Sequence, residues 1–346
     1  MAACCKRANV SPAVIFQPAE EGGGGAREMI RDGLFDKFPV EAVFGMHNWP
    51  GPQVGKFAVS PGPVMASSNE FKVVIRGKGS HAALPHNGID PVPVACQMVQ
   101  AFQTIITRNK RPIDAGVISV TMIHTGEATN VVPESCEIQG TVRTFTLEVL
   151  DLIEERMKAV AEHTCAAFGA SCEFEFHRNY PPTINHDAET DFARGVLSEL
   201  VGADNVLEFE PTMGAEDFSF FLQKKPGAYF MIGNGQGEHR EGGHGLTAGP
   251  CTLHNPHYDF NDEAIPYGVA YWVRLVERWL AEVANVRLHA TLNERPVDRW
   301  RVELPALQPL PFPVIRGPAV KPPHSVPIES IQHPLSVYAA LLGEVA

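Results

Sequence analysis

The sequence has no long hydrophobic run and is short of positive charge. No apolar stretch approaches the roughly 20 residues that span a bilayer, and none follows Lys6 and Arg7, so we expect no membrane association and no signal peptide. The 346 residues hold 28 Lys and Arg against 40 Asp and Glu, a formal net charge of −12. This acidic balance argues against nucleic acid or an anionic membrane as the main partner.

Cysteine is scarce, and its spacing does not indicate a set of disulfides. The seven cysteines are scattered apart from Cys4 and Cys5, and no CxxC spacing occurs. An odd, scattered set is typical of reduced thiols in a cytoplasmic protein, not of disulfides. The sequence therefore predicts a cytoplasmic location, and nothing in the spacing supports metal binding by the Cys4–Cys5 pair.

The first part of the chain has an α/β pattern. Residues 13–16 are a short apolar, β-branched run that predicts a buried strand. Residues 26–34 carry apolar side chains on one helical face, and Gly33 can close that helix. Residues 40–46 predict a second strand. Strand, helix and strand in this order are the signature of a parallel sheet.

The pattern changes near Pro61–Pro63. Strands are predicted over residues 71–77, 117–124, 136–145 and 172–177, and helices over residues 91–107 and 147–168. Strand–helix–strand–strand–helix–strand is the ferredoxin-like order. We expect this unit, residues 63–179, to be inserted in an α/β domain as a lid or pairing surface, and we call it the lid unit.

The α/β pattern resumes at Asp187. Helices are predicted over residues 190–201 and 264–283, a strand over 228–232, and a glycine- and histidine-rich loop over 233–249. Since 346 residues suffice for two cores, the expected domains are residues 1–62 with 180–284, and the lid unit. Residues 285–346 are proline-rich and predict an extended or disordered tail, with a candidate helix at its apolar end, residues 335–345.

Glu20 and Glu21 end the first apolar run and are followed directly by four glycines. Glycines after a strand free the backbone to turn, so both carboxylates can reach one centre. A cation at that centre would relieve their repulsion, with one carboxylate binding the ion and the other accepting a proton from water. The alternative is a solvated acidic turn before a helix. A phosphate loop is excluded because the Gly-Lys-Ser/Thr ending is missing.

Two histidines favour the metal interpretation. His47 ends the next predicted strand, where open α/β sheets place their sites, and His254 follows the glycine-rich loop. Each histidine alone is more often a satisfied polar residue than a ligand. Together with the Glu20–Glu21 pair they predict a site for zinc, manganese, cobalt or nickel.

Seven motifs occur in the order seen in one family. They are FQPAEEGGGGA, FGMHNWP, GKGSHAALPHNGIDP, TNVVPE, GTVRTF, MGAEDFSFF and LHNPHYDFND. Over roughly residues 14–280 the chain resembles the N-acyl-amino-acid amidohydrolases, which include hippurate hydrolases, aminoacylases and indole-acetyl-amino-acid hydrolases. The resemblance implies a metallopeptidase-type α/β catalytic domain with two metal ions and an inserted lid that pairs two subunits.

The resemblance also implies roles for single residues. Glu20 would be the general base, and Glu21, His47 and His254 would be metal ligands. Metal-activated water would attack the amide carbonyl of an N-acyl amino acid while Glu20 shuttles the proton. His81, from the partner's lid unit, would support the oxyanion, unless it is only a polar loop residue.

Three further residues, Asn130, Arg143 and Glu216, are candidates for substrate binding. By resemblance, Asn130 and Arg143 would hold the substrate carboxylate, although Arg143 can equally be a strand-end salt bridge. Glu216 and Asp217 would shape the site or cap the helix that follows them. We therefore expect a homodimer acting on a small N-acyl amino acid.

The chain departs from the family in one motif. The family's Cys-Gly-His-Asp motif, which supplies a bridging group and a histidine ligand, occurs nowhere in the sequence. We therefore expect an amino-terminally truncated member that holds metal weakly and has little activity by itself. The alternative to an amidohydrolase is an inactive remnant, a dimer that binds metal or carboxylates weakly.

Overall fold

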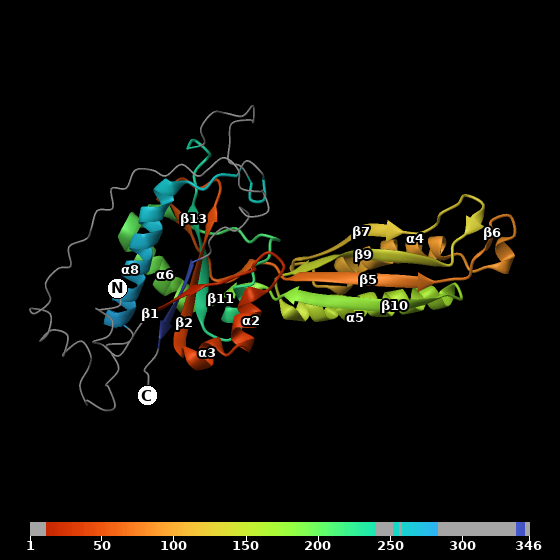
Figure 1. Cartoon of the computed structure of the whole chain (residues 1–346), viewed down its shortest axis with the longest axis horizontal. Helices are drawn as coiled ribbons and strands as arrows, with labels where there is room; N and C mark the ends of the chain where they lie inside the picture. The colour runs from red at the N-terminus through yellow and green to blue at the C-terminus, as the bar shows by residue number, and fades with distance from the viewer. Residues whose placement is uncertain (1–11, 240–251, 256–257, 283–336, 343–346) are drawn as a thin grey trace, which may run out of the picture.

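The computed structural model describes residues 12–239, 252–255, 258–282 and 337–342. Figure 1 shows two sheets that follow one another along the long axis of the molecule. A six-stranded sheet has helices on both of its faces, and a four-stranded sheet has helices on one face only.

The six-stranded sheet is mixed. In spatial order its strands are β1 (Pro12–Phe16), β14 (Val337–Leu342), β2 (Val40–Trp49), β13 (Gly227–Gly233), β3 (Phe57–Ala58) and β12 (Val206–Leu207). β13 runs parallel to β2, and β12 runs parallel to β3. β14 runs antiparallel to both of its neighbours, β1 and β2. The predicted strand–helix–strand unit is present, but β14 separates its two strands.

Helices cover both faces of this sheet because its central strands are apolar on both sides. Phe44 and Phe230 pack on one face in a core that also holds residues of α6 and α8. Val43 and Tyr229, one residue along, belong to the opposite core, which holds residues of α2 and α7. The helices and 3₁₀ turns of this part are α2 (Gly25–Arg31), α3 (Leu34–Lys37), α6 (Asp187–Val201), η3 (Ala203–Asn205), α7 (Ser219–Leu222), η4 (Asp262–Ala264) and α8 (Ile265–Glu282).

Two expectations for this sheet are wrong. The first strand is not buried: Val14 is 51% and Phe16 69% exposed, and only Ile15 lies in the core, because β1 is the edge strand. The apolar end of the tail is not a helix, since Val337–Leu342 pairs with β1 and β2 as a strand. The rest of the tail, residues 285–336 and 343–346, lies outside the described residues.

The four-stranded sheet has the predicted ferredoxin-like arrangement. Its strands, in spatial order, are β10 (Ser171–Tyr180), β5 (Ser68–Arg76), β9 (Ser135–Thr144) and β7 (Gly116–His124), all antiparallel. Alternation along β5 buries Phe71, Val73 and Ile75 and leaves the residues between them on the outer face. Gly140 on β9 is required because a Cβ there would lie 2.0 Å from the Ser119 carbonyl oxygen and 2.7 Å from the Phe71 ring.

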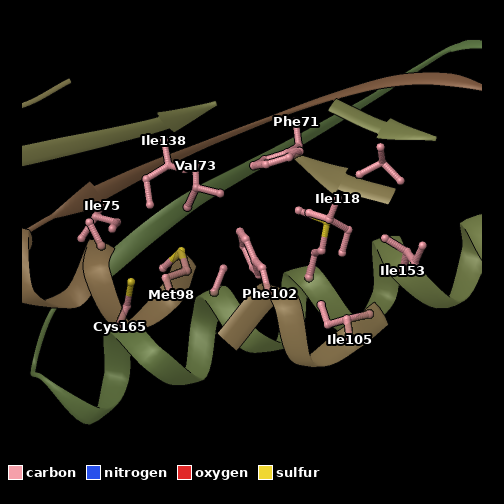
Figure 2. Close-up of a cluster of buried hydrophobic side chains, with 14 of the residues drawn as sticks. Phe71, Val73, Ile75, Met98, Phe102, Ile105, Ile118, Ile138, Ile153 and Cys165 are labelled. Carbon is pink, nitrogen blue, oxygen red and sulfur yellow. The ribbon is translucent and has the colours of Figure 1, made fainter. Parts of the chain in front are cut away.

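Two helices cover the inner face of this sheet. α4 (Pro91–Thr104) begins at Asp90, whose carboxylate accepts the Val92 N–H at 2.9 Å, and continues into one π-helical turn, η2 (Ile105–Asn109). α5 (Leu147–Ala167) begins at Thr146, whose hydroxyl accepts the Val149 N–H at 3.3 Å. Figure 2 shows the side chains of the sheet meeting those of the two helices in one closed core around Phe102.

Two short strand pairs lie at opposite ends of the four-stranded sheet. β4 (Gly62–Met65) pairs with β11 (Thr183–Asn185) where the chain passes between the two large sheets. β6 (Ser80–His81) pairs with β8 (Val131–Val132), beside the turn η1 (Pro85–Asn87), at the far tip (Figure 1). The exact domain limits stay a prediction.

Candidate functional site

The two glutamates lie in a tight turn after β1, which we call the Glu20–Gly24 turn (residues 20–24). Gly22 and Gly24 have φ of +86° and +62°, which favour glycine. The Gly22 N–H donates to the Glu20 carbonyl at 2.7 Å. The turn reverses the chain into α2, so that both side chains lie at the end of the sheet that the sequence predicted.

Three carboxylates meet on one side of this turn. Oxygen atoms of Glu20, Glu216 and Asp217 lie within 4.8 Å of one another. Asp217 accepts the Ala26 N–H at 3.0 Å and the Gln17 side-chain amide. Glu216 accepts the Phe218 N–H at 3.1 Å and the Tyr229 hydroxyl. Both residues are therefore held rigidly in the core. Glu216 bonds the backbone just before α7, but no side chain caps α7 itself.

This cluster is electrostatically costly without positive charge. Burial, with the carboxylates of Glu216, Glu21 and Asp217 nearby, raises the pKa of Glu20 to about 9. Burial and Glu216 likewise raise the pKa of Asp217 to about 7, against the hydrogen bond from Ala26. Such groups at neutral pH must hold protons or face a cation.

The three predicted metal ligands also lie together. The His254 Nε2 is 3.5 Å from a Glu21 carboxylate oxygen. His47, near the end of β2, is close enough to both residues for their charges to act on its pKa, which burial lowers. The His47 Nδ1 lies 2.6 Å from the Asn48 carbonyl oxygen, which only accepts, so Nδ1 carries the proton and Nε2 keeps its lone pair. A neutral imidazole of this kind is a metal ligand.

A cavity of about 480 Å³ opens beside the turn. The residues that line it are Glu20, Glu21, Gly22, Ser68, Glu70, Arg143, Asn179, Tyr180, Met213, Gly214 and Ala215. Arg143 is half-buried, and burial lowers the pKa of its guanidinium. The carboxylate of Glu70 lines the same cavity and its charge acts on Arg143, although the two are not within ion-pair distance in the described structure, so substrate binding and a salt bridge both stay alternatives for Arg143.

His81 and Asn130 lie elsewhere. Both are exposed at the tip of the four-stranded sheet, where the Ala82 N–H donates to the Asn130 carbonyl at 3.0 Å. The His81 Nδ1 accepts the Ala83 N–H at 3.0 Å, which leaves Nε2 as a donor. Figure 1 shows this tip at the opposite end of the molecule from β1 and β2, so neither residue reaches the Glu20 cavity of its own chain.

One residue of the cavity, Tyr180, was not predicted from the sequence. Tyr180 bonds the Glu20–Gly24 turn with its hydroxyl, although 156 residues separate it from Gly24. The predicted strand ended at residue 177, so the sequence did not even place Tyr180, which directly precedes Pro181 and Pro182, on a strand. Cys4 and Cys5 lie outside the described residues. No helix in the described part of the chain is long and apolar enough to cross a membrane.

Comparison with known proteins gives one consistent family. A family model described as peptidase family M20/M25/M40 matches residues 2–278. An N-acetyl-L-cysteine deacetylase from Bacillus subtilis is 40% identical over 252 residues, 73% of this chain and 56% of that protein. A hippurate hydrolase from Campylobacter jejuni is 35% identical over 270 residues, 77% of this chain and 67% of that protein. These relatives confirm the resemblance found in the motifs.

A solved structure is similar as well. A dinuclear metal-binding peptidase of the M20 family from Bacillus subtilis superposes with a TM-score of 0.64 at 31% identity, over 78% of this chain and 65% of that one. The likeness confirms the metallopeptidase-type α/β fold with its inserted ferredoxin-like unit. The chain spans little more than half the length of the first curated relatives that it matches.

Proposed function

The chain belongs to peptidase family M20/M25/M40, and we propose that it hydrolyses the amide bond of an N-acyl amino acid with the help of two divalent metal ions. The observation that carries the proposal is that Glu20 and Glu21 line one cavity while His47 and His254 lie next to Glu21. The named relatives act on substrates of this class, an N-acetylated cysteine and hippurate.

The residues present fit a divalent metal ion. The carboxylate of Glu21 and the imidazoles of His47 and His254 would hold it, and this mixed donor set suits zinc, manganese, cobalt or nickel. The neighbouring acidic cluster has a charge that such an ion would balance. When bound, the ion supplies Lewis-acid polarisation of the carbonyl and makes a water ligand more acidic.

The chain's own residues supply the rest of the reaction. Glu20 accepts a proton from water and returns it to the leaving amine, since its carboxylate lines the cavity without belonging to the proposed ligand set. Arg143 binds the carboxylate of the amino acid, because its half-buried guanidinium lines the same cavity and no described carboxylate lies within ion-pair distance of it, Glu70 acting on it only from farther away. Glu216, which accepts the Tyr229 hydroxyl, shapes the site by holding the acidic cluster next to Glu20.

We extend the proposal to a homodimer formed through the lid unit. β7 is an edge strand of the four-stranded sheet, and Met122 and Ile123 on it are 43% and 51% exposed. Exposed apolar residues on an unpaired edge favour pairing with a second copy. His81, whose Nε2 is a donor, and Asn130 would then serve the partner's cavity. A monomer mass by light scattering at micromolar concentration would reject this part. A cytoplasmic location stays a prediction.

The test is an assay on purified chain, stripped with a chelator and reloaded with zinc, manganese, cobalt or nickel. Hippurate and N-acetyl-methionine are the substrates. Because the family's Cys-Gly-His motif is missing, we expect metal-dependent turnover below roughly 1 s⁻¹, under ordinary enzyme rates. Glu20→Gln should abolish turnover and keep the metal, whereas Glu21→Gln should lose both. Glu210→Gln, at an exposed carboxylate, is the control.

Two outcomes would contradict the proposal. Equal metal loss in Glu20→Gln and Glu21→Gln would show that the two roles are assigned wrongly. Metal binding without turnover under any condition would instead favour the second candidate, a dimer that only binds metal and carboxylates. The absence of the Cys-Gly-His motif from all 346 residues is the observation that keeps this candidate open.

A further inference from the structure

Tyr180 is anchored on two sides. It is the last residue of β10, paired with Ser68 of β5 after a bulge at residues 178–180. Its ring meets Phe220 of α7 edge to face, with centroids 6.0 Å apart. The side chain is only 7% exposed. The position of its hydroxyl is therefore fixed by the four-stranded sheet and by α7 together.

The Tyr180 hydroxyl binds both ends of the Glu20–Gly24 turn. It accepts the Gly24 N–H at 3.1 Å and donates to the Glu20 carbonyl oxygen. A phenol has one proton to donate and lone pairs to accept, so one atom can serve both contacts. Gly24 is buried, and the hydroxyl is the partner of its N–H in the described structure.

Apart from Tyr180, two backbone hydrogen bonds close the turn, from the Gly22 N–H to the Glu20 carbonyl at 2.7 Å and from the Gly23 N–H to the Ala19 carbonyl at 3.0 Å, and the Asp217 backbone N–H bonds the Glu20 carboxylate. Ala19, Gly22 and Gly24 all have positive φ, and the residue that precedes α2 offers no side-chain cap. Glycine backbone is conformationally free, so the direction of the Glu20 side chain depends on contacts made from outside the turn. Tyr180 makes two of them, and its side chain lines the same cavity as Glu20.

We infer that Tyr180 is a positioning residue, whose hydroxyl fixes the Glu20–Gly24 turn from the end of β10 and so aims the Glu20 carboxylate at the cavity. The inference rests on the proposed role of Glu20 in proton transfer. It gives the four-stranded sheet a part in the reaction of its own chain, besides the part proposed for His81 in a partner.

The test is Tyr180→Phe in the full chain, which keeps the ring and its packing on Phe220 and removes only the hydroxyl. Tyr271→Phe is the matched control, because Tyr271 is fully buried in the other core and its hydroxyl has no hydrogen-bond partner in the described structure. Amide exchange at Gly24, metal content, kcat and KM are measured for each protein.

In Tyr180→Phe we expect the Gly24 amide to exchange at least about tenfold faster, because its buried N–H loses its acceptor. We expect kcat to fall about tenfold or more, with KM within about twofold and metal content unchanged, as for a misaimed proton acceptor. The control should match wild type. Para-aminophenylalanine at position 180, which can again donate and accept, should restore most of kcat.

Two results would overturn the inference. One is an unchanged Gly24 amide in Tyr180→Phe. The other is a rise in KM or a loss of metal that accounts for the whole fall in activity, since that would make the role structural. A wild-type chain without turnover would reject the proposed function alone, and the Gly24 amide would still decide whether Tyr180 holds the turn.

Discussion

The two sheets of this molecule differ in how the chain builds them. The four-stranded sheet and its two helices come from one continuous stretch between Ser68 and Tyr180. The six-stranded sheet takes its strands from positions between Pro12 and Leu342, and its neighbours β1 and β14 are separated by more than three hundred residues of sequence. The four-stranded sheet forms from contacts that are relatively local in sequence. The six-stranded sheet, which carries the proposed site, depends on contacts between segments that are far apart in sequence.

The core of the four-stranded sheet should give the largest effect. Phe102 is fully buried against Phe71, with ring centroids 5.8 Å apart, so Phe102→Ala leaves a cavity. We expect a loss of about 3–5 kcal/mol in the free energy of unfolding, confined to β5, β7, β9 and β10. Urea unfolding followed by amide exchange measures both the size and the place.

Phe168→Ala is the control for that change, because Phe168 is 47% exposed. It should cost less than about 1 kcal/mol. If Phe102→Ala lowered the protection of β2 and β13 against amide exchange as much as that of β5, the two sheets would unfold together. They would then differ only in how their strands are arranged along the sequence, not in stability.

The strand β14 should matter only to the six-stranded sheet. Ala339 pairs with Val14 on one side and Phe44 on the other, so Ala339→Pro removes a ladder hydrogen bond in the middle of three strands. We expect a loss of roughly 1–3 kcal/mol, with faster amide exchange in β1 and β2 and no change in β5. Ala339→Val, which keeps the N–H, is the control. Unchanged exchange in β1 would mean that β14 does not hold the edge strand.

The sequence predicted the local part of the fold best. Alternation and helical periodicity over residues 71–177 gave all four strands and both helices of the lid unit, in their order. The ends were missed where polar residues continue a strand: β10 runs on through Arg178 to Tyr180. β14 was predicted as a helix because a short apolar run does not by itself distinguish the two states, and the strand partners lie far away in sequence.

The site divides in the same way. Glu20, Glu21, His47 and His254 were identified from their residue types and their places after predicted strands and a loop, and then from the family motifs, and the structure brings them together. The role of Tyr180 was missed because it arises from a hydrogen bond between segments that nothing in a single sequence pairs. The exposure of β1 was missed for a similar reason, since the edge of a sheet is set by which strands pair, not by hydrophobicity.

The two sheets should respond to pH with opposite sign. Burial raises the pKa of Asp217 to about 7 and that of Glu20 to about 9, above their unfolded values near 4. The folded, metal-free chain thus holds protons that the unfolded chain releases, and stability falls as pH rises from about 4 to 9. We expect a melting temperature in chelator on the order of 5 °C lower at pH 8 than at pH 5. Asp217→Asn should shrink the drop.

A carboxylate of the four-stranded sheet is the control for this sign. The Lys72 ammonium, 2.7 Å from Glu137, lowers the pKa of that carboxyl. The contribution of Glu137 to the stability of the fold is therefore present above its unfolded pKa and is lost as pH falls through its folded pKa. Glu137→Gln should leave the fall between pH 5 and pH 8 unchanged. A wild-type chain that gains stability over this range in chelator would contradict the raised pKa values.

The smallest effect belongs to the ion pairs on the outside of the lid unit. Arg178 on β10 lies 2.7 Å from an Asp151 carboxylate oxygen and 2.6 Å from one of Glu154, both on α5, with its side chain 43% exposed. Exposed pairs gain little because water screens them and ordering long side chains costs entropy, so Arg178→Gln should lose only about 0.2–1 kcal/mol. The loss should shrink further in about 1 M salt, where the Debye length is near 3 Å. Urea unfolding of the single variant and of the double variant with Glu154→Gln measures the coupling. A loss above about 2 kcal/mol that persists in salt would mean that Arg178 stabilises the bulge that leads to Tyr180. The four-stranded sheet would then be coupled to the six-stranded sheet more strongly than their separate cores suggest.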